Sequence, residues 1–329
     1  MPTMTISHSG VTVANPPLNP RGGGPRGEVA GWSIKSARRC DAFLRSIHFE
    51  KLDEEALTGY ACTFTVRNLP DTHTDWARLI TILRKRLKRK GMVYGHCVTE
   101  WQMRGRFSDQ AVPHLHLVVF FPNDRLPTYE GCYPQDALRA IWLDVAAGYS
   151  TRLEGQDAKP ISDLVGWFKY LAKHAARGAH HYQRSVGTIP AGWQKTGRMW
   201  AKWGDWPVSI DKLIISDALF YALRRFSTRY QLASARKDLK RSHERLRDAA
   251  NYDQKQQALS FIKQSRKRLR YLKQRLQAPN DFARIVPVSD WVPSAVITHW
   301  LGHVAVKEEV YNEHTGEIRL AYYLAGEVR

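Results

Sequence analysis

Cysteine is scarce in this chain of 329 residues, and long apolar runs are missing. The four cysteines, at 40, 62, 97 and 132, show no C-x-x-C spacing, which argues against a thiolate zinc site and indicates a reducing cytosol. No uninterrupted apolar run approaches the roughly 20 residues of a membrane span. The first residues, MPTMTISHSG, lack the charged and apolar segments of a secretory signal. We therefore expect a cytosolic protein.

Acidic residues are also few, 31 against 50 Lys and Arg, which gives a net charge of +19. This balance is typical of proteins that bind a polyanion, and nucleic acid is the commonest polyanion in the cytosol. A basic surface that is merely solvated is the alternative. The length suits one catalytic domain with an extension. Residues 1–30 contain a segment rich in Pro and Gly and are expected to be a flexible leader.

A short apolar stretch, Val112 to Phe121, predicts a buried strand that carries two histidines. Side chains alternate across a strand, so His114 and His116 share one face while Leu115 and Leu117 lie on the other. Two imidazoles about 7 Å apart along a strand can bind one divalent metal. An H-x-H pair also arises by chance in a chain with 13 histidines.

Residues 92–101 form a second apolar run, and the polar segment between the two runs favours antiparallel pairing. This pairing can bring Glu100 beside His114 and His116. Two imidazoles and one carboxylate suit Mg²⁺ or Mn²⁺ better than a structural zinc ion. The metal site predicted from the residues alone is therefore His114, His116 and Glu100.

The surrounding pattern alternates strands with amphipathic helices. Strands are expected at 60–67, 92–101, 112–121 and 150–154, and helices at 74–90, 135–147 and 161–177. The order β-α-β-β-α-β followed by a helix is the ferredoxin-like (RRM-like) arrangement of an α+β domain with an antiparallel sheet. The basic residues at the end of helix 74–90 suit the helix dipole and can equally contact phosphates.

The helix expected at 161–177 carries Tyr170 and Lys173, three residues apart and on one face. A tyrosine hydroxyl, with a pKa near ~10, is a poor nucleophile at neutral pH unless a cation or metal favours its anion. Lys173 could provide this cation or bind the phosphate under attack. The alternative is that Tyr170 packs in the core and Lys173 is solvated.

In this order and spacing, FTVR at 64–67, Glu100, the PHLHLVVFF strand, the KYLAK helix and GRMW at 197–200 resemble the motifs of HUH endonucleases. These enzymes initiate rolling-circle replication, and the chain looks most like the initiators of filamentous phages and related plasmids. The resemblance covers about 60–205. H-x-H alone is a weak signal, whereas H-x-H with an upstream Glu and a downstream Y-x-x-K is fairly specific.

The resemblance implies a metal-dependent, site-specific nicking and joining enzyme of the bacterial cytoplasm. Tyr170 would form a 5′-phosphotyrosine link and leave a free 3′-OH, and host helicase and DNA polymerase would be partners. Many phage initiators carry two tyrosines on this helix, but the first position here is Gly166, so only Tyr170 remains. Tyr182 is a distant second candidate. In the nuclease domain, the residues expected to contact DNA are Arg67, Lys85, Lys88, Lys169 and Arg198.

Residues 216–277 are strongly helical with a break near Asn251, and heptad-like apolar positions predict an antiparallel hairpin. Residues 234–277 hold 14 Lys and Arg and 4 Asp and Glu, so their net charge is 14 − 4 = +10. Such an imbalance favours DNA backbone contacts, with dimerisation through the hairpin as the alternative. The residues expected to contact DNA here are Arg236, Lys237, Lys240, Arg241, Arg266, Lys267, Arg268 and Arg270.

The predicted organisation is therefore a leader at 1–30, an HUH endonuclease domain at 31–210, a basic helical hairpin at 211–280 and a small C-terminal segment at 281–329 with a possible β-hairpin. Three alternatives remain open. A transposase or conjugative relaxase shares the same site chemistry. A non-catalytic nucleic-acid-binding module would need exposed aromatic residues on its strands. A cupin-type oxygenase would need a nearby downstream Glu and a further His.

Overall fold

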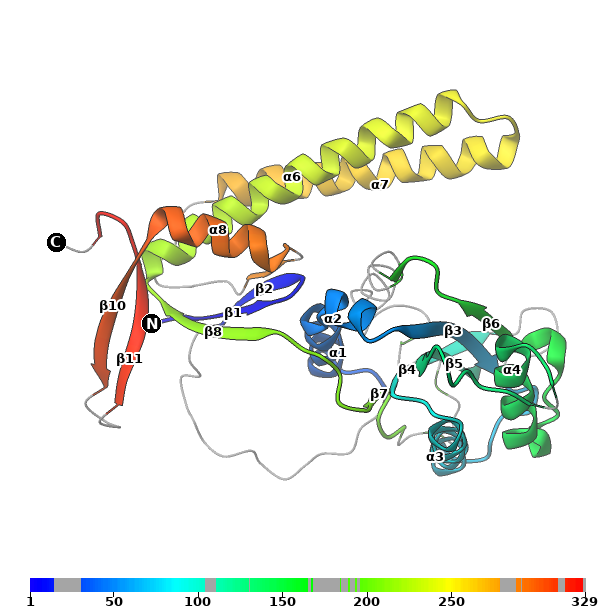
Figure 1. Cartoon of the computed structure of the whole chain (residues 1–329). Helices are drawn as coiled ribbons and strands as arrows, with labels where there is room; N and C mark the ends of the chain where they lie inside the picture. Colours follow the sequence, from blue (N-terminus) through cyan, green and yellow to red (C-terminus); the bar gives the residue numbers. More distant parts are fainter. Residues whose placement is uncertain are drawn as a thin grey trace. The chain divides into compact units, whose positions relative to one another are not determined.

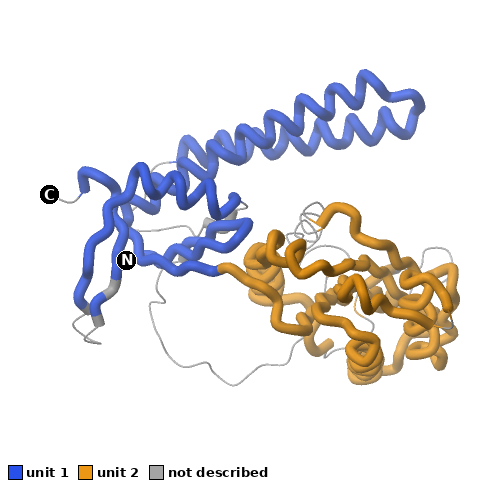
Figure 2. The backbone as a smooth tube through the Cα atoms, in the orientation of Figure 1, with its two compact units in different colours: residues 1–21, 210–329 blue, residues 22–209 orange. Residues whose placement is uncertain are grey.

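The computed structural model describes residues 1–14, 31–103, 111–129, 131–164, 196–278, 288–290, 292–312 and 317–327, together with Trp167, Arg184, Ile189 and Trp193. The chain divides into two compact units (Figure 2). Unit 1 comprises residues 1–21 and 210–329, and unit 2 comprises residues 22–209. None of the described helices is long and apolar enough to cross a membrane.

Unit 2 is built on a five-stranded sheet in which every neighbouring pair is antiparallel (Figure 1). Across the sheet its strands are β6 (Asp157–Pro160), β3 (Leu57–Thr65), β5 (Ala111–Pro122), β4 (Tyr94–Met103) and β7 (Trp200–Trp203). Its helices are α1 (Ile34–Ser46), α2 (Phe49–Glu54), α3 (His73–Arg89) and α4 (Pro134–Val145). The chain order β3-α3-β4-β5-α4-β6 is the predicted β-α-β-β-α-β, and the class is α+β as expected.

The fourth strand of this series was predicted at the wrong place. Residues 150–154 are not a strand: Ser150 has a left-handed backbone conformation with φ of 52°, and Leu153–Gly155 form a 3-10 turn, as do Ala147–Tyr149. Because these turns redirect the chain, it reaches the edge of β3 only at β6, where Asp157 pairs with Thr63. The short stretch 150–154 has strand-like composition but no free strand edge to pair with.

Helices α3 and α4 cover one face of this sheet. Trp142 of α4 stacks on Phe64 of β3 at a ring-centroid distance of 5.4 Å, and Trp76 of α3 meets the same indole edge-on at 5.7 Å. Trp76 also donates a hydrogen bond to the Thr99 hydroxyl, 3.1 Å away. Since Thr99 is paired with Leu115, its side chain lies on the face opposite Glu100 and His114. The histidine face is therefore the one that α3 and α4 leave uncovered.

Helix α1 packs on part of the histidine face, at some distance from the histidine pair. His96 lies on the same face of β4 as Glu100, about 13 Å along the strand. Phe43 of α1 stacks on the His96 ring at 5.6 Å, and Cys40 Sγ lies 3.6 Å from His96 Nε2. The face is thus covered at the His96 end.

Unit 1 contains a six-stranded sheet that corrects the expectation of a flexible leader over 1–30. Its order is β10 (Ala305–Asn312), β11 (Glu317–Leu324), β8 (Ile210–Ile215), β1 (Thr3–Ser7), β2 (Gly10–Ala14) and β9 (Val288–Asp290). Strands β11 and β8 are parallel, and the other pairs are antiparallel. Residues 3–14 form strands because Met4, Ile6, Val11 and Val13 alternate with polar residues and are buried. The Pro- and Gly-rich stretch at 15–30 lies outside the described residues.

The predicted helical hairpin is present in unit 1 as α6 (Asp217–Arg247) and α7 (Tyr252–Gln277). Asn251 sits at the break and caps α7, because its side-chain oxygen accepts a hydrogen bond from the Gln254 backbone N–H at 2.9 Å. The predicted apolar contacts between the helices include Leu232, Ala235 and Leu272. Beyond them the hairpin extends away from the unit 1 sheet (Figure 1).

The rest of unit 1 packs around the start of α6. Leu219, Phe220 and Leu223 are buried against the sheet and against α8 (Ser294–Val304). The predicted C-terminal β-hairpin is also confirmed, as β10 and β11. The first part of α6 thus belongs to a folded core, while the second part forms the hairpin.

Candidate functional site

The predicted metal ligands lie on adjacent strands in the middle of the unit 2 sheet. Glu100 of β4 is directly opposite His114 of β5, and His116 is opposite Val98. On the other side of β5, Thr65 is opposite His114 and Thr63 is opposite His116. Paired residues point to the same face, so the two imidazoles and the carboxylate share it. The His114 and His116 ring centroids are 4.7 Å apart.

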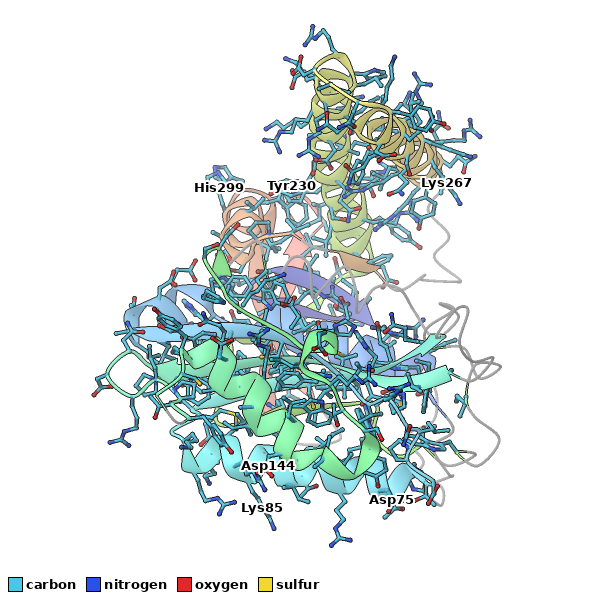
Figure 3. All side chains as sticks on the ribbon, turned by 90° about the vertical axis from the view of Figure 1, so that its right-hand side faces the viewer. Asp75, Lys85, Asp144, Tyr230, Lys267 and His299 are labelled. Atoms are coloured by element: carbon cyan, nitrogen blue, oxygen red, sulfur yellow. The ribbon has the colours of Figure 1, made fainter. Side chains whose placement is uncertain are left out.

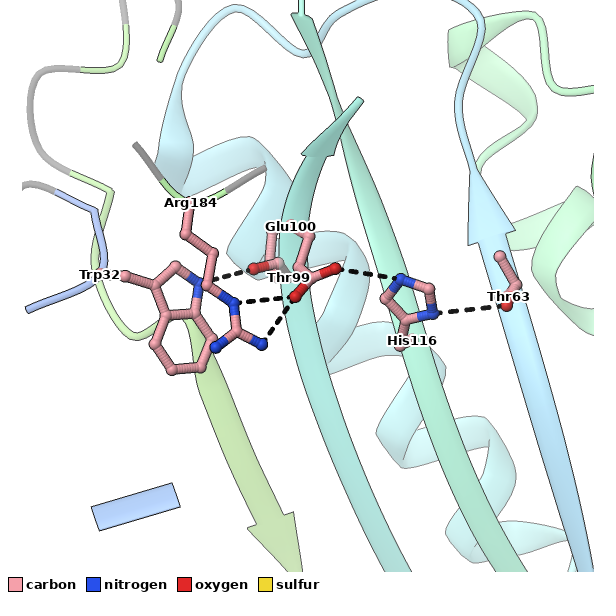
Figure 4. A network of polar contacts seen from close by, with 6 residues as sticks. All are labelled: Trp32, Thr63, Thr99, Glu100, His116 and Arg184. Carbon is pink, nitrogen blue, oxygen red and sulfur yellow. Dashed lines mark hydrogen bonds and ion pairs between the residues drawn. The ribbon is translucent and has the colours of Figure 1, made fainter. Parts of the chain in front are cut away.

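The Glu100 carboxylate connects His116 to an arginine that the sequence did not single out (Figure 4). Glu100 Oε2 lies 3.4 Å from His116 Nε2, at ion-pair distance. Glu100 Oε1 accepts a hydrogen bond from Arg184 Nε at 2.8 Å and lies 2.6 Å from Arg184 Nη2. The side chains of Arg184 and Glu100 are only 0% and 1% exposed. On its far side, His116 Nδ1 is 3.5 Å from the Thr63 hydroxyl.

Charge governs the protonation state of this cluster. Burial alone would raise the pKa of Glu100, but the contact with His116 and the positive charges of Arg184 and His116 lower it from 4.5 to about 2. Burial lowers the pKa of His114 to about 4, and the nearby His116 lowers it further against the opposing effect of Glu100. At neutral pH Glu100 is therefore ionised and His114 is neutral, which are the states that bind metal ions.

Arg184 is held by residues far away in the sequence. Its guanidinium carbon lies 4.2 Å from the ring centroid of Trp32, a cation–π contact. Trp32 in turn donates a hydrogen bond to the Thr99 carbonyl at 3.0 Å. Arg184 lies in a polar stretch, and 84 positions separate it from Glu100. No local pattern could therefore have identified it.

The side chains present fit a divalent cation. Two buried atoms of the cluster, Glu100 Oε2 and His114 Nδ1, have no hydrogen-bond partner among the described residues. Buried polar atoms normally have partners, and a cation would supply one for these two. A carboxylate and two imidazoles are ligands that Mn²⁺ and Mg²⁺ accept. Because Arg184 holds Oε1, Glu100 would offer one oxygen.

The structure brings only some of the predicted site residues together. Arg67 follows β3 on the same edge as Thr65 and is exposed. Arg198 is exposed just before β7, and its neighbour Met199 accepts a backbone hydrogen bond from Thr99 at 2.8 Å. Lys85 and Lys88 are exposed on α3, which covers the other face of the sheet, so they are not gathered at this site (Figure 3).

The predicted nucleophile helix lies mostly outside the described residues. Tyr170, Lys173, Lys169 and Tyr182 all fall there. Its first turn is described, since the Trp167 backbone N–H donates to the Asp163 carbonyl at 2.9 Å. The roles of Tyr170 and Lys173 therefore stay predictions from the sequence.

The hairpin of unit 1 exposes the cations expected to contact DNA. The exposed residues are Arg236, Lys237, Lys240, Arg241, Arg266, Lys267, Arg268 and Arg270. Arg268 forms an ion pair with Asp238 at 3.3 Å. Lys267 is labelled on the hairpin in Figure 3. Most of this charge faces solvent, which leaves it available to a polyanion.

The Replication-associated protein G2P of Pseudomonas phage Pf3 is 40% identical to this chain over 275 residues, which cover 82% of this chain and 84% of the phage protein. The chain belongs to the family of this phage replication-associated protein. Proteins of Xylella fastidiosa strains 9a5c and Temecula1, provisionally named replication proteins, are 39% and 38% identical over 246 residues each. These matches cover 72% of this chain and 81% and 88% of the two relatives. No family model and no solved structure matches the chain.

Proposed function

We propose that this protein is a rolling-circle replication initiator of the HUH type, which nicks origin DNA and later rejoins it. One observation carries the proposal: His114, His116 and Glu100 share one sheet face in a chain that is 40% identical to a phage replication-associated protein. The strand order β6-β3-β5-β4, all antiparallel, is compatible with the ferredoxin-like domain of this enzyme class. The names of the relatives favour replication over transposition or conjugation.

In this proposal His114, His116 and one oxygen of Glu100 hold a Mg²⁺ or Mn²⁺ ion. When bound, the ion supplies positive charge that polarises the scissile phosphate. Arg184 fixes Glu100 in its ionised state and in one orientation, and Thr63 lies beside the second ring nitrogen of His116. The chain thus preorganises the ligands before DNA binds.

Tyr170 is the proposed nucleophile. Its oxygen forms a bond to phosphorus while the bond from phosphorus to the 3′ oxygen breaks, and that oxygen takes up a proton as the free 3′-OH. Lys173 stabilises negative charge on the tyrosine oxygen or on the phosphate. The phosphotyrosine link retains the phosphodiester energy, so that attack by a 3′-OH can close the circle. A host polymerase extends the free 3′-OH, and a host helicase opens the duplex, in the bacterial cytoplasm.

The basic hairpin is the proposed contact to origin duplex flanking the nick. Helix α7, with 26 residues, is about 39 Å long, enough to span roughly one turn of B-DNA. Its exposed aromatic residues Tyr252 and Tyr271 lie about 28 Å apart, which does not make the stacking platform that single strands need. Contacts from cations to phosphates of a duplex therefore suit this surface better.

The test is formation of a covalent adduct. Purified full-length protein with Mn²⁺ is mixed with labelled single-stranded oligonucleotides that tile the replicon encoding it. We expect a protein–DNA band that resists denaturation with the wild type and with the matched control Tyr182→Phe. The band should vanish in Tyr170→Phe, in His114→Ala and on addition of EDTA. An adduct that persists in Tyr170→Phe would overturn the assignment of the nucleophile.

A further inference from the structure

A cavity of about 430 Å³ opens at the end of β3, beside the candidate metal site. Thr65 lines it, and the same Thr65 is directly opposite His114 in the sheet. The other residues that matter here are Arg67, Arg152, Glu154 and Gly155, which are all exposed. The volume is in the range of small-molecule sites. The cavity therefore adjoins the histidine pair but is not part of the cluster around Glu100.

The walls of this cavity are fixed by buried hydrogen bonds. The Gln156 side-chain oxygen accepts from the Thr65 backbone N–H at 2.9 Å, and its amide nitrogen donates to the Arg152 carbonyl, also at 2.9 Å. The Arg67 backbone N–H donates to the Tyr149 carbonyl at 3.2 Å. Since these bonds tie both arginine-bearing segments to the sheet, their backbones are preorganised for a ligand.

The chemistry of the lining indicates which ligand would fit. Two guanidinium groups, from Arg67 and Arg152, favour a phosphate, which arginine can bind with two parallel hydrogen bonds. Glu154 would repel a bare anion, but its carboxylate accepts hydrogen bonds from amino groups on base edges. A nucleotide offers both groups at once. Double-stranded DNA would keep its bases paired and out of a cavity of this kind.

We propose that this cavity binds one nucleotide of the single-stranded DNA next to the scissile phosphate, through Arg67, Arg152 and Glu154. The inference rests on the proposed nicking function for its substrate. It adds a positioning site: a nucleotide held beside Thr65 would fix the strand relative to His114 on the neighbouring strand.

The experiment measures single-strand binding without nicking. Full-length Tyr170→Phe protein in EDTA is titrated against a fluorescein-labelled 12-nucleotide single strand of mixed sequence, with excess unlabelled duplex to occupy other basic surfaces. Arg67→Gln and Arg152→Gln, each made in this background, should weaken binding about tenfold, because each removes a charged hydrogen bond to phosphate. Arg125→Gln is the matched control, since Arg125 is exposed and follows the opposite end of β5. It should bind like the parent.

A second variant blocks the cavity without removing charge. A side chain added at Gly155 would meet only the Thr65 methyl group at 3.5 Å, an ordinary contact, so Gly155→Phe can fill the space. It should also weaken single-strand binding, while thermal unfolding by circular dichroism confirms that the variants are folded. Equal binding by the folded Arg67→Gln, Arg152→Gln and Arg125→Gln proteins would overturn the nucleotide site. That result would leave adduct formation by Tyr170 intact, so the two proposals fail separately.

Discussion

Arg184 and Glu100 form a buried ion pair, with Nη2 and Oε1 2.6 Å apart, between a residue outside the sheet and the centre of β4. The pair explains how a carboxylate with 1% exposure remains charged. It also leaves one carboxylate oxygen toward His116. The arrangement therefore ties the stability of unit 2 to the state of its candidate metal site.

Replacing Arg184 by Met should be strongly destabilising, because it leaves the Glu100 charge buried without its partner. We expect a loss of roughly 3–5 kcal/mol in the free energy of unfolding, measured by urea denaturation at pH 7. The double variant Arg184→Met/Glu100→Gln removes both charges and should recover much of this loss. If the double variant were as unstable as the sum of the single variants, the pair would not be coupled.

His96 should make the fold sensitive to acid. Burial lowers the pKa of His96 from 6.5 to about 3. In the unfolded chain the imidazole takes up a proton below pH 6.5, whereas the folded chain refuses it until about pH 3, so stability falls as the pH decreases through this window. The slope is at most about 1.4 kcal/mol per pH unit for one group.

The variant His96→Phe keeps a ring to stack on Phe43 but cannot be protonated. Its free energy of unfolding should fall less steeply than that of the wild type between about pH 6.5 and 4.5. His114, whose pKa is also lowered, titrates in both proteins, so the difference between the two curves isolates His96. Identical slopes would show that His96 is not the group that remains neutral on folding.

Charge on the hairpin should set the salt dependence of duplex binding. The triple variant Arg266→Gln/Lys267→Gln/Arg270→Gln removes three exposed cations from α7. The slope of log K against log salt should become shallower by roughly 0.9 for each DNA phosphate that the variant no longer neutralises. Adduct formation on a short single strand should change little. The control replaces three exposed neutral residues of the same helix, Gln256→Ala/Gln264→Ala/Gln274→Ala.

A slope unchanged in the cationic triple variant would argue against DNA binding by this surface. Dimerisation through the hairpin would then be the competing explanation. Sedimentation of the wild type and the triple variant at the same concentrations distinguishes the two, because a dimer interface would shift the oligomeric state while leaving the salt slope in place.

The sequence by itself determined the local elements of unit 2 and the hairpin. Periodicity of apolar residues specified α3, α4 and the strands β4 and β5, because burial of one face imposes a repeat of 3.6 or 2 residues. It also specified the pairing that places Glu100 beside the histidines, since a one-residue slip would turn the histidines away from Glu100. The break at Asn251 was readable for the same local reason: its side chain caps α7.

Only the tertiary structure decided the features that depend on contacts between distant residues. Residues 3–14 become strands because they find an edge of β8, which is about 200 positions away in the chain. Arg184 joins Glu100 because the fold excludes water from both, and burial of a charge demands a partner wherever one can be found. The cavity beside Thr65 arises likewise from two loops that meet in space. Such long-range pairings leave no periodic trace in the sequence, so packing alone settles them.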